Sequence, residues 1–329
     1  MRTMALPTVH ILYENPAWLP PLIAGLEAEG FPYALHEVRQ GMFDPSEPPA
    51  EGIYLNRMSP SSHTRGHLES VDLTREILAW LEGYGRRIIN GSRAFDLEVS
   101  KFRQALVLER HGILTPRTVL CVGEEQLVAA ARTFDGPFIT KHNQGGKGLG
   151  IALYHSAAEL ETAMQSSDWD PGPKGQMVVQ QYIASAEPYI TRVELVADRF
   201  LYAMRSATTD GFELCPSDAC QLPTKGPDVC PIDGGAKFSP SPLRADDPLV
   251  TQYLRMMKAE GIEVAGIEFV EDAEGRRYTY DINGTTNYNS AVGREVGVDG
   301  MRELARYLRQ SLRKRVVTPE PTRTRDRAA

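Results

Sequence analysis

A lysine and a cluster of glycines stand close together in the segment FITKHNQGGKGLGIAL, residues 138–153. Lys141 ends a short apolar run, and residues 144–150, which are rich in glycine, follow it almost without side-chain bulk. Glycine lets backbone N–H groups approach a bound anion closely, and the ammonium of Lys141 can lie over the same anion. Because a second apolar run resumes at residue 151, the segment predicts a strand, a glycine-rich turn and a strand.

The glycine spacing differs from both common phosphate-binding fingerprints. It is neither G-x-x-x-x-G-K-[ST] nor G-x-G-x-x-G, and both of those require a helix directly after the loop. Here the first helix signal is Ser156, an N-cap before AAELETAM. A two-stranded flap over a phosphate therefore fits the segment better. The other interpretation is a plain glycine-rich turn with no ligand, which is the more common case for such a loop taken alone.

A second set of chemical groups lies in a predicted hairpin near the C-terminal end. If its turn centres on residues 274–275, Glu268 lies directly opposite Asp281, and Asn283 projects to the same face as Asp281. Opposed like charges destabilise an antiparallel pair, and a divalent cation would remove that repulsion. Two carboxylates and an amide oxygen suit Mg²⁺ better than Zn²⁺. The alternative is a register shifted by one residue, with both acids in solvent.

These groups need a scaffold, and the pattern of the chain predicts four segments. Strands alternate with helices up to residue 90, which is typical of a small parallel α/β unit, so residues 1–92 form the first domain. Residues 93–183 form a central unit that carries the glycine-rich lid. Residues 184–316 form a C-terminal unit with the acidic hairpin, and residues 317–329 form a disordered tail.

Four arginines of this scaffold stand where ligands could be bound. Asn56, Arg57 and Arg65 follow a strand of the N-terminal unit, where parallel α/β sheets place their ligands, and the two arginines could bind a substrate carboxylate. Arg192 and Arg205 alternate with apolar neighbours on two further predicted strands.

The composition of the chain excludes several classes of partner. Its 329 residues are 42% apolar and 24% charged, which is ordinary for a soluble protein. A net charge of −7 gives no support to a nucleic-acid or membrane partner. The N-terminus lacks a secretion signal, so we expect a cytoplasmic location. Cys215, Cys220 and Cys230 share one stretch without a C-x-x-C spacing, which favours reduced thiols over a metal site.

The order of these motifs resembles the ATP-grasp superfamily, and within it the RimK-type carboxylate–amine ligases and the glutathione synthetases. The likeness runs from about Arg93 to Lys314. It implies an ATP-grasp fold of α/β (α+β) class, preceded by a small Rossmann-like pre-ATP-grasp domain.

The resemblance implies a nucleotide site built from four motifs. The two lysines Lys101 and Lys141 would hold phosphates, residues 144–150 would form the lid, residues 180–183 would contact adenine, and Glu187 would bind the ribose. The full set is Lys101, Lys141, Gln144, Gly145, Gly146, Lys147, Gly148, Gly150, Gln180, Gln181, Tyr182, Ile183 and Glu187.

The resemblance also implies catalytic, metal and substrate residues. Arg192 and Arg205, together with Lys141, would act at the γ-phosphate and the acyl-phosphate. The metal ligands would be Glu268, Asp281 and Asn283, and the substrate contacts Asn56, Arg57 and Arg65.

Three features depart from the family pattern. Gln181 stands where the hinge commonly has Glu, and the acids occur as Glu268 then Asp281 in place of Asp then Glu. The loop after Arg205, TTDGFELCPSDACQLPTKG, has no recognisable family motif, so the substrate stays open.

We therefore predict an ATP-dependent ligase that joins a carboxylate to an amine through an acyl-phosphate. It would use ATP with one or two Mg²⁺ ions, or Mn²⁺ in their place, and small-molecule or peptide substrates. A homo-oligomer suits the resemblance. The alternatives are an ATP-grasp kinase acting on a hydroxyl and a nucleotide-binding protein without catalysis.

Overall fold

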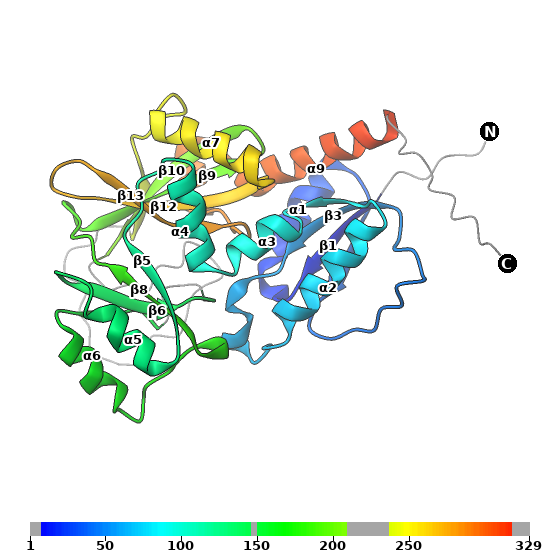
Figure 1. Cartoon of the computed structure of the whole chain (residues 1–329). Coiled ribbons are helices and arrows are strands. Elements are labelled where there is room, and N and C mark those ends of the chain that lie inside the picture. Colours follow the sequence, from blue (N-terminus) through cyan, green and yellow to red (C-terminus); the bar gives the residue numbers. More distant parts are fainter. Residues whose placement is uncertain (1–7, 146–149, 209–236, 318–329) are drawn as a thin grey trace, which may run out of the picture.

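A computed structural model of the chain describes residues 8–145, 150–208 and 237–317, and shows three sheets that follow one another along the sequence (Figure 1). The first is a four-stranded parallel sheet in the order β2-β1-β3-β4, which confirms the predicted parallel α/β unit. Its elements are β1 (Thr8–Tyr13), α1 (Pro20–Glu29), β2 (Tyr33–Glu37), β3 (Gly52–Arg57), α2 (Ser70–Gly83) and β4 (Arg87–Ile89).

The second sheet carries the first half of the glycine-rich segment. It is antiparallel, in the order β5-β8-β6-β7, and helices α5 and α6 contribute Leu127 and Leu160 to the core that Phe138 and Val179 share. The order places β6, which bears Lys141, between two neighbours. Its elements are β5 (Thr118–Val122), α5 (Glu124–Ala131), β6 (Phe138–His142), β7 (Ala152–Tyr154), α6 (Ala157–Met164) and β8 (Gln176–Gln181).

The third sheet carries the acidic hairpin. Its five antiparallel strands run in the order β11-β10-β9-β12-β13, and α7 packs Tyr253 and Met256 against Val193 and Ile267 on one face. We refer to this side as the α7 face. The elements are β9 (Tyr189–Val196), β10 (Arg199–Ala207), β11 (Phe238–Pro240), α7 (Pro248–Glu260), β12 (Val264–Glu271), β13 (Arg277–Asn283) and α8 (Ser290–Val296).

Two helices connect the first sheet to the second. The sequence pattern does not reveal α3 (Ser92–Glu98), which is only seven residues long. The predicted helix after Ser100 is α4 (Lys101–Arg110), and the Ser100 hydroxyl caps it by accepting from the Arg103 N–H at 3.2 Å. The mixed α/β (α+β) class is thus confirmed.

The last helix packs on the N-terminal sheet as well as on the unit to which the sequence assigned it. Helix α9 (Gly300–Val317) packs Leu304 and Leu308 against Leu22 and Leu26 of α1, so the C-terminal helix covers the N-terminal sheet (Figure 1). The apolar stripe of α9 is satisfied there because α1 presents a matching apolar face.

Several predictions from the sequence fall outside the described residues. They concern Gly146, Lys147 and Gly148 of the lid, the three cysteines Cys215, Cys220 and Cys230, and the tail over residues 318–329. In the described part of the chain, none of the helices has the length and apolar character needed to cross a membrane.

Candidate active site

The register of the acidic hairpin is the one that the sequence predicts, since Glu268 pairs with Asp281. It arises in an unexpected way. Glu271 pairs with Arg277, so the turn centres on Glu274 and the strands start one residue out of the predicted register. Tyr280 has no pairing partner on β12 and forms a bulge, after which Glu268 pairs with Asp281 as predicted. The Asn283 amide donates to Asp281 Oδ2 at 3.2 Å, so all three predicted metal ligands lie on one face.

Two lysines from other elements reach this acidic pair. Lys101, at the first turn of α4, forms an ion pair with Asp281. Lys141, only 5% exposed, donates to Gln180 Oε1 at 2.8 Å and lies 5.7 Å from the centroid of the Tyr280 ring. Asn143 holds the two elements together, because it accepts from the Lys101 N–H at 2.9 Å and from the Phe102 N–H at 3.0 Å.

The environment of Lys141 weakens its hold on a proton. Burial and the neighbouring Lys101 lower the pKa of Lys141 to about 8, against the opposing effect of Asp281 and Glu268. Burial disfavours the ionised form of Asp281, but Lys101 and Lys141 overcome this and hold its pKa below the usual range. Perturbed pKa values and closely opposed charges of this kind are common where a charged ligand is bound.

A buried arginine occupies the centre of the same face. Arg192 Nε donates to Glu194 Oε1 at 2.7 Å, and Nη1 donates to Glu268 Oε1 at 2.6 Å. Gly266 on the neighbouring strand makes room for it, since a Cβ atom there would lie 2.2 Å from Arg192 Nη2. Burial and the charge of Asp281 raise the pKa of Glu268 in spite of Arg192.

The donor set of the hairpin fits a hard divalent cation. Glu268 and Asp281 supply carboxylate oxygens and Asn283 an amide oxygen from one face of two paired strands. Mg²⁺ in nucleotide sites is typically held by one or two carboxylates together with phosphate oxygens and water. Among residues 8–145, 150–208 and 237–317, no group of three or more His, Cys, Asp or Glu side chains is placed to hold a metal alone.

The predicted adenine-binding hinge leads directly into an apolar patch. Ile183 and Tyr280 pack against a small cluster formed by Ile190, Val270 and Tyr278. The Gln181 side chain accepts from the Arg117 N–H at 3.3 Å, which fixes the hinge to β5. A flat apolar ring could lie on this patch, next to the backbone of the hinge.

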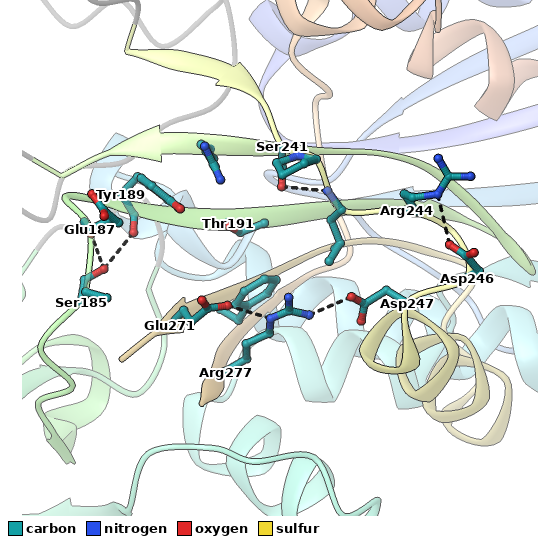
Figure 2. A pocket seen from close by; sticks show the side chains of 15 residues that line it. Ser185, Glu187, Tyr189, Thr191, Ser241, Arg244, Asp246, Asp247, Glu271 and Arg277 are labelled. Carbon is teal, nitrogen blue, oxygen red and sulfur yellow. Dashed lines mark hydrogen bonds and ion pairs between the residues drawn. The ribbon is translucent and has the colours of Figure 1, made fainter. Parts of the chain in front are cut away.

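Arg192 and Arg205, which the family resemblance places near the γ-phosphate and the acyl-phosphate, lie on opposite faces of the sheet. Arg192 pairs across the sheet with Met204, whereas Arg205 pairs with Thr191. Directly opposed residues share a face, so Arg205 lies on the α7 face and Arg192 on the face of Glu268. The reason is a bulge at Leu201, which shifts every later residue of β10 by one position. Glu187, predicted to bind ribose, also borders a pocket on the α7 face (Figure 2).

The predicted substrate residues contact other parts of the protein. Asn56 donates to Asn90 O at 3.2 Å, and Arg57 donates to Thr286 O at 2.7 Å. Arg65 binds Glu14, with Nε 3.0 Å from Oε1. Arg57 therefore joins the N-terminal sheet to the loop after Asn283, and none of these three side chains projects as a free group from the sheet edge in this conformation. Of the lid, Gln144 lies within 3.5 Å of Pro60 O in the N-terminal unit.

Sequence reasoning missed two buried acids, Glu14 beside the predicted substrate residue Arg65 and Glu98 beside the loop after Asn283. Glu14 is 1% exposed and directly follows β1. An acid at the end of a parallel strand is a signal that the sequence does contain. Glu98 is the last residue of α3 and accepts from the Thr285 N–H at 3.0 Å, which fixes the loop that follows Asn283. Nothing in the local pattern marks Glu98, because its partner lies 187 residues further along the chain.

Glu98 is expected to make stability depend on pH. Burial raises its pKa to about 7, against the opposing effects of Thr285, Lys101 and Arg57. The folded chain therefore keeps this proton between about pH 4.5 and 7 while the unfolded chain releases it, so stability falls as pH rises through that window. We expect Glu98→Gln to be more stable than the parent at pH 8, by up to roughly 3 kcal/mol, and similar near pH 4.5.

Urea unfolding at both pH values measures this difference. The glutamine amide can still accept from Thr285, so the comparison isolates the charge. An equal difference between the two proteins at both pH values would contradict the assignment of the proton to Glu98.

Comparisons with known proteins agree with this geometry. Residues 99–213 match the family model described as RimK-like ATP-grasp domain. A protein named probable alpha-L-glutamate ligase from Haemophilus influenzae (strain PittEE) is 23% identical over 239 residues, which is 73% of this chain and 73% of that protein.

Solved structures share the fold of almost the whole chain. The RimK domain protein ATP-grasp from Sphaerobacter thermophilus DSM 20745 is 19% identical, with a TM-score of 0.61 over 91% of this chain and 98% of that one. The ATP-grasp ligase PsnB, complexed with minimal precursor, Mg and ADP, is 15% identical, with a TM-score of 0.62 over 95% and 99% of the two chains. The chain therefore has the ATP-grasp fold, and its residues 99–213 are similar to a RimK-like ATP-grasp domain.

Proposed function

We propose that the chain is an ATP-dependent carboxylate–amine ligase that forms an amide bond through an acyl-phosphate. One observation carries the proposal: Lys101 and Lys141 approach Glu268 and Asp281 from other elements, so that cations and carboxylate oxygens able to bind a metal face one space. A nucleoside triphosphate with its magnesium needs cations for its phosphates and oxygen ligands for the metal, and a single bound nucleotide must be able to reach both.

The reaction proceeds in two displacements. A carboxylate oxygen of the acid substrate attacks the γ-phosphorus, the bond to the β-phosphate oxygen breaks, and ADP leaves. The amine nitrogen then attacks the acyl carbon, phosphate leaves with the C–O bond electrons, and the nitrogen gives up a proton. Lys101 and Lys141 neutralise phosphate charge, and Arg192, 3% exposed, keeps the carboxylate of Glu268 oriented.

We assign the metal role to Glu268, Asp281 and Asn283. Mg²⁺ bound there would neutralise charge on the phosphates during transfer. The PsnB structure contains Mg and ADP, which supports the binding of a magnesium–nucleotide complex by proteins of this fold. One or two ions, and Mn²⁺ as a substitute, are part of the proposal.

For substrates we propose an amino acid or a peptide on at least one side of the new bond. The relatives named probable alpha-L-glutamate ligase favour glutamate, and the PsnB complex with precursor peptide PsnA2 favours a peptide. Asn56, Arg57 and Arg65 stay proposed substrate contacts, and Arg57 would act through the loop at Thr286. Gln180–Ile183 and the described lid residues Gln144, Gly145 and Gly150 stay the proposed nucleotide contacts. A cytoplasmic location and a homo-oligomer also stay predictions.

Phosphate release over pairs of acids and amines tests the proposal. We expect release only when both partners are present, with the amide identified by its mass. A stable phosphoester without free phosphate would instead indicate a kinase. ATP binding without consumption across a panel that includes glutamate and short peptides would indicate a nucleotide-binding protein.

The lowered pKa of Lys141 predicts a pH limit for the free enzyme. Lys141 must be protonated to attract phosphate, and its pKa is lowered to about 8 by burial and by Lys101. We expect kcat/KM for ATP to fall above about pH 8, whereas kcat should persist to higher pH because bound phosphates keep the ammonium charged. Steady-state kinetics with varied ATP at saturating acid and amine measure kcat/KM and kcat at each pH. A constant kcat/KM up to about pH 10 would contradict the assignment.

A further inference from the structure

A pocket of about 450 Å³ opens on the α7 face of the C-terminal sheet (Figure 2). Its floor is formed by Tyr189, Thr191, Arg205 and Phe269, and the connection between β11 and α7 forms one wall with Leu243. The size falls within the range of small-molecule sites, roughly 300–1,000 Å³.

This pocket lies on the opposite side of the sheet from the candidate active site. Thr191 pairs with both Arg205 and Phe269, so these three residues share the α7 face. The next residues along the strands, Arg192 and Glu268, pair with each other on the other face. The two sites are therefore back to back across the same strands.

Most charged residues that line the pocket already have an ion-pair partner. Arg277 binds Asp247 and Glu271 at 2.8 Å each, which Figure 2 shows as a bridge across one side. Arg244 pairs with Asp246 at 3.4 Å, where both are exposed. Of the three cations and four anions that line the pocket, Arg205 and Glu187 have no ion pair within the described part of the chain.

The guanidinium of Arg205 is held in place by a ring contact, but its Nε lacks a hydrogen-bond acceptor in the described part of the chain. Its guanidinium carbon lies 4.3 Å from the centroid of the Tyr189 ring, which fixes the plane of the group. Its Nε is buried and has no hydrogen-bond partner within the described part of the chain. A buried donor without a partner is rare in proteins, and a carboxylate is the acceptor that best matches a guanidinium.

We propose that this pocket binds a free amino acid. The carboxylate would accept from Arg205, and the ammonium would lie toward Glu187, which has no ion-pair partner among the described residues. An anion without an ammonium would be repelled by Glu187, whereas the zwitterion satisfies both charges. Tyr189, Leu243 and Phe269 supply an apolar surface for the side chain. The site is separate from the ATP face, so the proposal does not rest on the ligase activity.

Three probes with one carbon skeleton test this site by isothermal titration of the full chain without nucleotide. They are L-leucine, 4-methylpentanoate, which lacks the amine, and L-leucinamide, which lacks the carboxylate. We expect L-leucine to bind, and each analogue to bind at least about 10-fold more weakly, because each loses one charged hydrogen bond. The absence of saturable L-leucine binding to the parent protein would overturn the proposal.

Variants place the binding in the pocket. Arg205→Gln should weaken L-leucine binding about 10-fold or more, while Arg199→Gln, an exposed position at the start of the same strand, should leave it unchanged. Glu187→Gln should weaken L-leucine and strengthen 4-methylpentanoate. Lys141→Met should leave L-leucine binding intact. If binding survives in Arg205→Gln but is lost in Lys141→Met, the amino acid occupies the ATP face and the pocket assignment is wrong.

Discussion

Replacement of Lys141 by methionine is expected to reduce amide formation about 10²- to 10³-fold, the usual cost of losing one buried charge donor at a reacting centre. Lys141 lies on β6, within the second sheet, and its ammonium faces Asp281 and Glu268 of the third. Methionine fills similar space without a charge, so the loss would arise from the phosphate contact. ATP consumption and product mass, measured at saturating substrates, report it.

The same change is expected to stabilise the folded protein at pH 7 by roughly 2 kcal/mol. In the folded chain burial and Lys101 lower the pKa of Lys141 to about 8 from an ordinary value of 10.5. The unfolded chain binds the additional proton between those values, so parental stability rises with pH across that window. Below about pH 8 the parent bears the full cost of the buried charge, on the order of 3 kcal/mol, which methionine avoids. The variant also loses the hydrogen bond to Gln180, which lowers its free energy of unfolding by roughly 1 kcal/mol.

A matched control is Lys174→Met, because Lys174 is an exposed lysine that pairs with Asp72 in the described structure. It should retain activity. Full activity in Lys141→Met would remove the glycine-rich segment from the mechanism. A variant that loses both activity and the folded state would contradict the stability argument, and urea unfolding at pH 7 separates these outcomes.

Two bulges decide on which faces of the C-terminal sheet the predicted site residues lie. The pairing of Glu268 with Asp281 holds because the bulge at Tyr280 compensates for a turn that is centred on Glu274. On β10 the bulge at Leu201 acts the other way and moves Arg205 to the α7 face. Alternation of side chains predicts a face only as long as the register is unbroken, and no local pattern in either strand marks its bulge.

Predictions that depended on short-range chemistry held better than those that needed distant contacts. The Ser100 cap and the start of α4 at Lys101 are local and are confirmed. The contact of Arg57 with Thr286 spans 229 residues, and that of Glu98 with Thr285 spans 187. Such contacts are set by how the sheets pack on each other. For the same reason the sequence could not place α9 on the N-terminal sheet.

Asp281→Asn is expected to shift the Mg²⁺ concentration for half-maximal activity upward at least about 10-fold and to lower kcat by a further 10²-fold or so. Glu268 already has a strong partner, since Arg192 Nη1 lies 2.6 Å from its carboxylate. Asp281 is the carboxylate whose partner, Lys101, would turn toward phosphate when ATP binds. We therefore expect Asp281 to supply most of the unpaired negative charge that binds Mg²⁺.

The asparagine keeps the size of the side chain and an oxygen for Asn283 to bind, so folding should be preserved. It leaves Lys101 without its anion, close to Lys141, which should lower the pKa of Lys141 further and move the fall in kcat/KM for ATP to lower pH. Glu274→Gln, an exposed acid at the turn of the same hairpin, is the control and should leave both quantities unchanged. The shift in the pH profile separates a lost metal ligand from general damage to the hairpin, because damage alone would reduce activity equally at every pH. An unaltered Mg²⁺ requirement in Asp281→Asn would mean that the cation is bound elsewhere on this sheet.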